Sequence, residues 1–578
     1  MPKNLSRFTV GVRVSFLPRA FKRLDEAKKF NTTKTGQERL YGLITGVEIE
    51  GQSSIAVIEV DGFAGLQAKI KFGSLKYEDL EPAAPATRQQ PETNGVAGLV
   101  DYDSDSSSDV RDDDDNNNDA NPVENENNQW TDEEVPIDAR LVNLSYMQDS
   151  QITLTNAAYS SPIQMFMHFL PMDHIARHVI PAIIAKAAIL SLGYWKDLTL
   201  EEYMLWIGLW TSMLLIPMSD RGKYWSTAPS FLFTTPVNFS RWMTRRRFEM
   251  ILKAHTLEHP TVINASSDPL VDIRGYLNAY NDNLAASMIP GKTLTIDESM
   301  NQWLGKVSRM PNVKKILGKP HPVGQEFKNI ADATTNIMLR LDISEKNQDG
   351  KEFSNLGAVG GCIVRLTKPW FASGRTIVAD SWFGSPAVAA ALRKKGLYSI
   401  MALKKRKYWP RNVPKDIIDN LPGTYGSHVC KVATIDAVPM FIAALRDRKP
   451  QCLISTCSST IPGSIVSHVV KENNQSRRVE FQRAVVFDDY NAAKGAIHIN
   501  NNIRDNMFSY HDVIGTNTWQ HRSFAFFLAV AEANAFLAWR AFGPENLRNM
   551  SQSQFRDRLA SELVHKYDPY STENNAST

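Results

Sequence analysis

Two short stretches of sequence decide the fold, TLTID at residues 293–297 and TIVAD at residues 376–380. Each is a largely apolar run that ends in aspartate, which is typical of a buried strand in an α/β sheet. Because α/β sheets bind ligands at the carboxyl ends of their strands, we expect Asp297 and Asp380 at one rim of a sheet. Aspartate at a strand's end is also common as a turn residue or a helix cap, without any chemistry.

The two aspartates are the candidate metal ligands of the chain. Carboxylate oxygens are the ligands that Mg²⁺ and Mn²⁺ prefer, and adjacent strands can bring two of them together. A pair of such cations can activate a nucleophile and stabilise the leaving oxygen of a phosphodiester. Asp297 and Asp380 are therefore also the first candidate catalytic residues.

The regions around these strands differ in texture, and a length of 578 residues suggests roughly three or four domains. The region before the first stretch reads as helical, whereas strands alternate with helices after it, as in an α/β core. We divide the chain into residues 1–82, a small all-β barrel; 83–140, a disordered acidic linker; 141–290, an α-helical block; 291–401, the first part of the core; 402–485, an inserted subdomain; 486–545, the last core helices; and 546–578, a loose polar tail.

The first region reads as short strands punctuated by glycine, which suits a small barrel. YGLITGVEIE at residues 41–50 and IEVDG at residues 58–62 are similar to Tudor or chromo-like barrels of the SH3 type. Such a barrel could read histone tails or chromatin proteins, with Phe16, Tyr41 or Phe63 caging a methylated cation. The simpler interpretation is that the same aromatic side chains fill the barrel's own core.

The net charge of +3 conceals a strong asymmetry along the chain. Residues 101–134 contain ten Asp, four Glu and one Arg, so this segment carries −13 and the remainder +16. Low hydrophobicity together with charge of one sign predicts disorder. A basic body beside an acidic segment indicates a polyanionic partner, nucleic acid above all, although a solubilising linker gives the same pattern.

Two classes of protein are excluded by composition. Four cysteines without a C-x-x-C pair provide neither a disulfide framework nor a thiolate zinc site, so we expect no zinc. The most apolar window, residues 203–216, is shorter than the roughly 20 residues of a membrane span, and the polar residues Met1–Arg7 lead us to expect no signal peptide. We therefore expect no membrane partner.

Basic side chains gather in several places, and cations beside aromatic rings suit contacts with phosphates and bases. The segment 393–411 contains eight Lys or Arg with Tyr408 and Trp409 among them; a solvated face or a nuclear import signal at 404–407 are the alternatives. A further basic group comprises Arg309, Lys314, Lys315 and Lys319. The candidate DNA-binding residues are Arg245, Arg246, Arg247, Lys328, Lys394, Lys395, Lys404, Lys405, Arg406 and Lys407.

An ordered set of motifs over about residues 160–542 resembles the piggyBac transposases and their domesticated relatives. The motifs are LTLEEYMLWIGLWTSMLLIP at 198–217, RGKYWS at 221–226, RWMTRRRFEMILKAHTL at 241–257, LTIDESM at 294–300, GKPHPVGQEFK at 318–328, IVADSWFGSP at 377–386, YNAAKG at 490–495 and AEANAF at 531–536. The resemblance implies an RNase H-like core, DDE-type cut-and-paste transposition with Mg²⁺ or Mn²⁺, and a homodimer. It also implies double-stranded DNA held by the helical block and the insertion, and hence a nuclear location.

The sequence departs from the family pattern at the third catalytic acid. After Tyr-Asn-x-x-x-Gly the family motif Gly-Val-Asp-x-x-Asp is replaced by AIHINN at 496–501, so His498 occupies the third acidic position and Asn501 the one beyond it. Imidazole is a poor ligand for Mg²⁺ and supplies no negative charge. Asp505 shares the helix face of His498 but lies about 10.5 Å along the axis, too far to substitute.

These observations predict a transposase-derived DNA-binding protein with an incomplete catalytic triad, in which cut-and-paste chemistry is lost. Two alternatives remain open. One is an active metal-dependent transposase that uses Asp297, Asp380 and an unconventional third ligand. The other is a chromatin interaction protein that works through its N-terminal barrel.

Overall fold

The structure is a computed structural model of the 578-residue chain, and the chain divides into two compact units, Met1–Tyr102 and Asp103–Thr578. The described residues are the strands between residues 13 and 77, residues 130–135, and residues 148–569 except for 219, 227–236, 317–318, 320, 349, 404–408, 410–412, 473–474 and 515–517.

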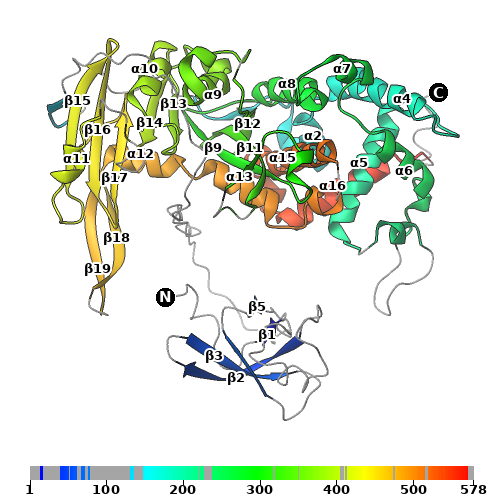
Figure 1. Cartoon of the computed structure of the whole chain (residues 1–578), viewed down its shortest axis with the longest axis horizontal. Helices are drawn as coiled ribbons and strands as arrows, with labels where there is room; N and C mark the ends of the chain where they lie inside the picture. The colour runs from blue at the N-terminus through cyan, green and yellow to red at the C-terminus, as the bar shows by residue number, and fades with distance from the viewer. Residues whose placement is uncertain are drawn as a thin grey trace. The chain divides into compact units, whose positions relative to one another are not determined.

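The N-terminal unit contains a five-stranded sheet in the order β4-β3-β2-β1-β5, and all neighbouring strands are antiparallel (Figure 1). Its strands are β1 (Arg13–Phe16), β2 (Leu40–Glu50), β3 (Ser53–Val60), β4 (Gln67–Lys71) and β5 (Lys76–Tyr77). Phe16 and Tyr41 lie on these strands, whereas Phe63 lies outside the described residues. Closure of the sheet into a barrel and a role in reading chromatin stay predictions.

A helical block precedes the core sheet. Its helices are α2 (Pro162–His168), α3 (Met172–His174), α4 (Ile180–Ile189), α5 (Leu200–Leu215), α6 (Arg245–Ala254), α7 (Pro260–Ala265) and α8 (Val271–Ala286), and the short strands β7 (Gln151–Ile152) and β8 (Met288–Ile289) pair beside it. Thr199 caps α5 by accepting the Glu202 N–H, and Trp206 and Trp210 on that helix are fully buried. The apolar window at 203–216 is thus a core helix, as its length predicts.

The second unit is built on one ten-stranded mixed sheet. The strands of its core half are β9 (Thr293–Gln302), β10 (Val313–Lys315), β11 (Val323–Asp332), β12 (Met338–Ile343), β13 (Thr376–Ala379) and β14 (Tyr398–Ala402). They run in the order β12-β11-β9-β13-β14, with β11 antiparallel to β9 and β13 and β14 parallel to it. When the short β10 is left out, the core strands β9, β11, β12, β13 and β14, numbered one to five in chain order, take the spatial order 3-2-1-4-5, which agrees with the RNase H-like arrangement that the resemblance implies.

Helices cover both faces of this core half (Figure 1). The helices α9 (Gly357–Thr367) and α10 (Pro386–Lys394) pack on one face, and α12 (Val485–Ala493), α13 (Ala496–Asp505) and α15 (Trp519–Phe542) contact the other. The central strands are therefore buried on both sides, which is why TLTI and TIVA are apolar.

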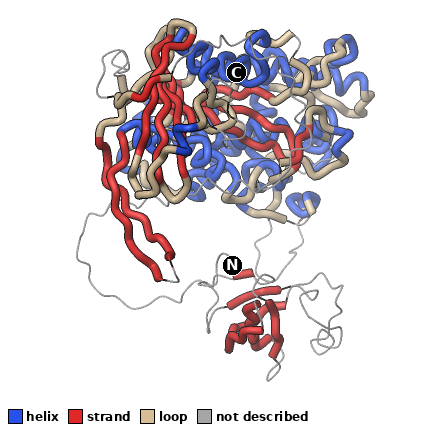
Figure 2. The backbone as a smooth tube through the Cα atoms, turned by 60° about the vertical axis from the view of Figure 1, so that its left-hand side comes forward, coloured by secondary structure: helices blue, strands red, loops and turns tan. Residues whose placement is uncertain are grey.

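The insertion continues the same sheet. β15 (His428–Ile435), β16 (Val438–Arg446) and β17 (Pro450–Ser455) extend it from β14, and the short helix α11 (Asp416–Asp419) contacts β15 and β16. Figure 2 shows β18 (Pro462–Glu472) and β19 (Gln475–Ala484) as a two-stranded ribbon that extends away from this sheet.

A strand within the predicted disordered linker is ordered at the far edge of the sheet. β6 (Thr131–Asp132) pairs antiparallel with β15, and the Lys431 ammonium lies 2.7 Å from the Asp132 carboxylate. Val135 follows β6, is only 3% exposed and exchanges backbone and side-chain hydrogen bonds with Thr460. The sequence prediction failed here because the pairing partner lies some 300 residues away along the chain, at β15.

The C-terminal segment is ordered over its described residues, 546–569, so the prediction of a loose tail at 546–578 is wrong for that part. After α14 (Tyr510–Val513) and α15, the helix α16 (Gln552–Lys566) packs against α5 and α2. Its buried Arg556 forms an ion pair with Glu532 of α15, at 2.5 Å between Nε and Oε1. By length and hydropathy α15 could cross a membrane, but 89% of that apolar window is buried inside the fold, as in a core helix.

Candidate active site

Strand register brings the two aspartates together at the carboxyl end of a parallel strand pair. The last pair between β9 and β13 is Ile296 with Ala379, so Asp297 and Asp380 follow at the same level of the sheet. β9 does not end at Asp297, as the sequence suggested, but continues to Gln302 because its other edge stays paired with β11. Asp297 therefore lies within a central strand, at the point where one of its two neighbours stops.

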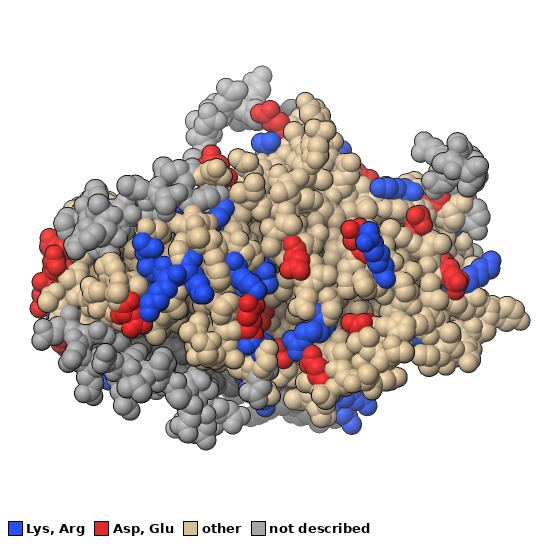
Figure 3. All heavy atoms as spheres, turned by 90° about the horizontal axis from the view of Figure 1, so that it is seen from above, with Lys and Arg blue, Asp and Glu red and all other residues tan. Residues whose placement is uncertain are grey.

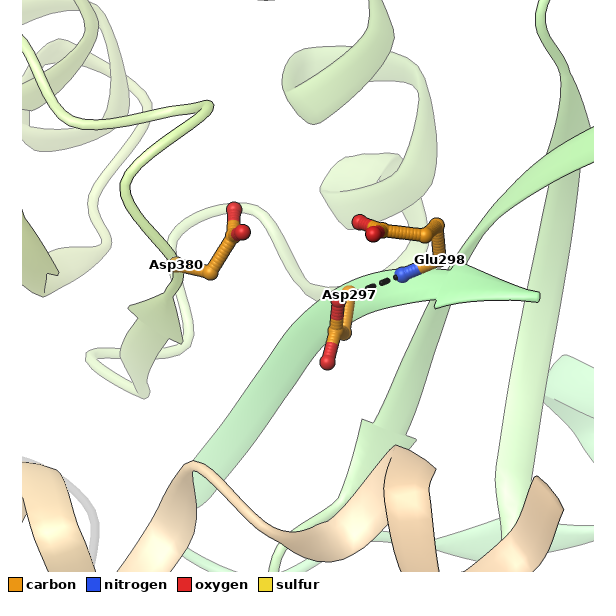
Figure 4. Close-up of side chains that lie close together, drawn as sticks. All are labelled: Asp297, Glu298 and Asp380. Carbon is orange, nitrogen blue, oxygen red and sulfur yellow. Dashed lines mark hydrogen bonds between the residues drawn. The ribbon is translucent and has the colours of Figure 1, made fainter. Parts of the chain in front are cut away.

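A third carboxylate joins them. One ligand oxygen each from Asp297, Glu298 and Asp380 lies within 4.8 Å of the others. Figure 4 shows that Asp297 and Glu298 leave β9 on opposite sides, and that the Glu298 carboxylate turns toward Asp380. The Asp297 carboxylate accepts the Glu298 N–H at 2.7 Å and that of Asp380 accepts the Trp382 N–H at 3.0 Å, which fixes both short side chains.

His498 approaches this cluster from α13. Its Nε2 lies 3.1 Å from Asp297 Oδ2, and its side chain is 44% exposed. Asn501, one turn further along the helix, donates from Nδ2 to the Glu298 carbonyl at 3.1 Å and accepts from the Ser299 hydroxyl at 2.6 Å. The helix position that carries the third acid in the resembling family thus presents an imidazole to Asp297.

Polar contacts fix α13 in this register. The buried Asn500 amide donates to the Asn336 carbonyl at 3.0 Å and to Asn534 Oδ1 on α15 at 2.9 Å. Asp505 is held by Arg504 at 2.7 Å and does not belong to the acidic cluster. A slide of the helix that would bring Asp505 to the site would break these contacts.

Lysines surround Glu298. Its carboxylate lies 2.5 Å from Lys319 Nζ and 3.5 Å from Lys328 Nζ, and Lys328 is 2.9 Å from Glu326, which in turn is 2.7 Å from Lys314. The five residues Lys314, Glu326, Lys328, Glu298 and Lys319 form a chain of alternating charge, which we call the charge ladder. Lys328, in its centre, also lies 4.0 Å from the centroid of the Trp382 ring.

Burial and charge set the protonation of the acids. Burial, and then the charges of Glu298 and Asp380, raise the pKa of Asp297 well above its ordinary value. Burial and Glu298 raise the pKa of Asp380 to about 6. Burial also disfavours ionised Glu298, but Lys328 and Lys319 outweigh it and lower the pKa of Glu298. Burial and Lys319 lower the pKa of His498, so that its imidazole is neutral at pH 7.

The donor set fits one divalent cation better than two. Three carboxylates at this spacing offer the hard oxygen ligands of Mg²⁺ or Mn²⁺. Two lysines already compensate Glu298, and the neutral His498 adds no charge, so little negative charge is left for a second dication. Asp297, Glu298 and Asp380 are the residues that would hold the single ion.

The candidate DNA-binding residues are found in different environments. Lys328 is 2% exposed and lies inside the acidic site, away from the surface. Arg247 is half of a bidentate pair with Glu202, at 2.7 and 2.6 Å, and stacks over Trp195, so its first role is structural. Arg245 and Arg246 lie in the first turn of α6, where Arg245 pairs with Glu249 and Arg246 with the Tyr194 ring.

The remaining candidates lie at the C-terminal end of α10 and beyond it. Lys394 is 54% exposed and pairs with Asp436, and Lys395 lies over the rings of Phe353 and Phe371. On the face that Figure 3 shows, Lys and Arg side chains gather on one side with Asp and Glu among them. The other four candidates lie outside the described residues: Lys404, Lys405, Arg406 and Lys407.

Glu298 is the site residue that sequence reasoning missed. Neighbouring residues on a strand point to opposite faces, which argues against Asp297 and Glu298 sharing a site. The glutamate reaches Asp380 only because its side chain is long and β13 ends one residue earlier. The signal that could have revealed it is the sequence DE itself, since an acid in a central strand needs buried cations, and Lys319 and Lys328 follow within 30 residues.

Comparisons with known proteins bear on this site. Residues 161–536 match the family model described as Transposase IS4. No curated protein matches the sequence. Among solved structures, the cryo-EM structure of a piggyBac transposase synaptic complex with hairpin DNA is similar, with a TM-score of 0.58 and 16% identity over 75% of this chain and 85% of that one. At that identity the likeness shows a shared fold.

Proposed function

Because this chain belongs to the Transposase IS4 family, of the piggyBac type, we propose that it is a DNA-binding protein in which cut-and-paste transposition is lost or strongly reduced. The observation that supports this proposal most is the position of His498, 3.1 Å from Asp297 where the family carries an acid. Losing one of three carboxylates removes the charge that gathers a second cation, and two cations stabilise both the attacking and the leaving oxygen.

Double-stranded DNA is the proposed partner. The similar solved structure is a transposase complex with DNA, and outside residues 101–134 this chain carries a net charge of +16. Arg245, Arg246, Lys394 and Lys395 are the described candidates that remain for phosphate contacts, because Lys328 is buried in the acidic site and Arg247 is paired with Glu202. A homodimer and a nuclear location are part of the same proposal, as the family resemblance implies.

Within the site, a single bound Mg²⁺ or Mn²⁺ would supply Lewis-acid activation of a phosphodiester. The chain's own residues have separate tasks. Asp297, Glu298 and Asp380 provide the oxygen ligands, and backbone N–H groups orient the two aspartates. Asn500 and Asn501 hold α13 so that His498 faces Asp297.

The test is a calorimetric titration of the full chain with Mn²⁺, with His498→Asp as the comparator. We expect about one equivalent of Mn²⁺ to bind to the natural sequence, and tighter binding with a second equivalent in the variant. The proposal fails if the natural sequence already binds two equivalents as tightly as the variant does. His511→Asn, a change outside the acidic cluster, controls for effects of histidine replacement elsewhere in the fold.

A second candidate function is an active metal-dependent transposase with Glu298 as the unconventional third ligand. The observation in its favour is the position of the Glu298 carboxylate, within 4.8 Å of ligand atoms of both aspartates. Strand cleavage in Mn²⁺ that disappears in both Asp297→Asn and Glu298→Gln would establish it. Cleavage that is absent from the natural sequence but gained in His498→Asp would favour the first proposal.

A further inference from the structure

The two lysines on Glu298 differ in how firmly they are held. Lys328 has a side chain only 3% exposed, is tied to Glu326 at 2.9 Å and is covered by Trp382. Lys319 has a side chain 29% exposed, and its only described ionic partner is Glu298. In the charge ladder, Lys328 at the centre is therefore firmly held, whereas Lys319 at the end beside the acidic site can change its ionic partner.

The contact between Lys319 and Glu298 competes with cation binding. Lys319 Nζ lies 2.5 Å from Glu298 Oε1, so an ammonium group occupies one of the glutamate oxygens that a cation would need. An ammonium group close to a ligand also repels a dication directly. The Glu298 carboxylate thus lies at the site but is paired with Lys319. It becomes available to a cation when another anion binds that lysine.

A phosphodiester backbone is the anion that would compete best. Lysine is a flexible point charge that binds phosphate well, and Lys319 belongs to a basic stretch with Lys314 and Lys315 on the neighbouring strand β10. The acidic cluster is where a scissile phosphodiester would come to lie in a transposase of this family. A backbone phosphate beside it would reach Lys319 from the exposed side.

We propose that Lys319 is a positioning residue that makes cation binding dependent on DNA: a backbone phosphate draws its ammonium group away from Glu298, and the freed carboxylate completes the cation site with Asp297 and Asp380. This inference rests on the proposed function, since it concerns the same site and the same partner. Lys328 stays in place and keeps the carboxylate of Glu298 ionised. By linkage, the cation strengthens DNA binding by the same factor by which DNA strengthens cation binding.

The experiment compares Mn²⁺ affinities by calorimetry in the full chain, with and without a saturating 20-base-pair duplex, a length of roughly two helical turns. The variants are Lys319→Gln, which frees Glu298, and Lys315→Gln, which removes an exposed positive charge from the same basic stretch. For the natural sequence we expect DNA to tighten Mn²⁺ binding by about tenfold, the size of a typical coupling. Lys319→Gln should bind Mn²⁺ that tightly without DNA and gain little from adding it, whereas Lys315→Gln should behave like the natural sequence.

The outcomes separate this inference from the proposed function. If Lys319→Gln binds Mn²⁺ no more tightly than the natural sequence in the absence of DNA, the inference is wrong whatever DNA does. If the natural chain shows no affinity for duplex DNA by fluorescence anisotropy, the proposed function is wrong, and the DNA-free arm still decides whether Lys319 blocks Glu298. Adding Glu298→Gln to Lys319→Gln should abolish the gain in Mn²⁺ affinity; a gain that persists would assign it to general electrostatics.

Discussion

At the scale of single residues, the sequence predicts some members of the site and not others. Asp297 and Asp380 could be predicted because each follows an apolar strand, and His498 because it interrupts a spaced motif. Glu298 could not, since strand alternation assigns it to the other face, and only the end of β13 lets its carboxylate turn back. The burial of Lys328 was also hidden, because a lysine in a charged segment normally lies at the surface.

The centre of the charge ladder yields a prediction for stability. Replacing Lys328 by methionine leaves Glu298 and Glu326 buried with less compensation, and breaking a buried ion pair costs about 3 kcal/mol or more. We expect the free energy of unfolding, measured with urea, to fall by about that amount. Lys315→Met, at an exposed position, should change the free energy of unfolding by less than about 0.5 kcal/mol. Equal effects of the two variants would refute the stabilising role of Lys328 in the charge ladder.

At the scale of elements, long-range pairing decided what the sequence could not predict. The helix α16 has a polar composition, yet its Phe555, Leu559 and Leu563 are buried. It packs closely on α5, where a Cβ added at Gly208 would lie only 2.9 Å from Leu563 Cβ. β6 is too short and polar to be recognised alone and exists through its bonds to β15. The core strands were predictable because strands buried on both faces consist largely of apolar residues, a pattern that can be recognised within each strand.

The role of α16 can be tested by deletion of one buried side chain. Leu563→Ala should lower the free energy of unfolding by about 2–5 kcal/mol, the usual cost of a large-to-small change in a core. Asp557→Asn, on the exposed side of the same helix, should be nearly neutral. Chemical denaturation monitored by tryptophan fluorescence measures both changes. If Leu563→Ala left the free energy of unfolding unchanged, α16 would not be packed in the core and the prediction of a loose tail would stand.

His521, on the helix α15, should make the stability of the fold depend on pH. Burial and Lys186 lower the pKa of His521 from 6.5 to about 4, so the folded chain resists a proton that the unfolded chain accepts. The free energy of unfolding should therefore fall as the pH drops from about 6.5 to 4, by about 3 kcal/mol from this residue. Urea denaturation at pH 7 and pH 5 measures the loss, and it should be smaller in His521→Gln if that histidine is responsible.

At the scale of the whole molecule, charge is divided between the acidic segment and the remainder of the chain. A body with +16 outside residues 101–134 that binds phosphates should release counterions on binding DNA. We expect its affinity for a duplex of arbitrary sequence to fall by at least about tenfold between 50 and 200 mM salt. Fluorescence anisotropy measures this, and an affinity that does not depend on salt would exclude phosphate contacts as the source of binding.

The acidic site combines residues of a central strand with a residue of a covering helix, and these two places differ in how much the fold depends on them. Asp297 lies on a central strand whose hydrogen bonds on both edges hold the domain together, whereas His498 lies on a covering helix and has a partly exposed side chain. A change at His498 can therefore alter the acidic site while the architecture persists. In a fold built this way, the chemistry proposed for the acidic site can change while the surface that a binding partner meets stays the same.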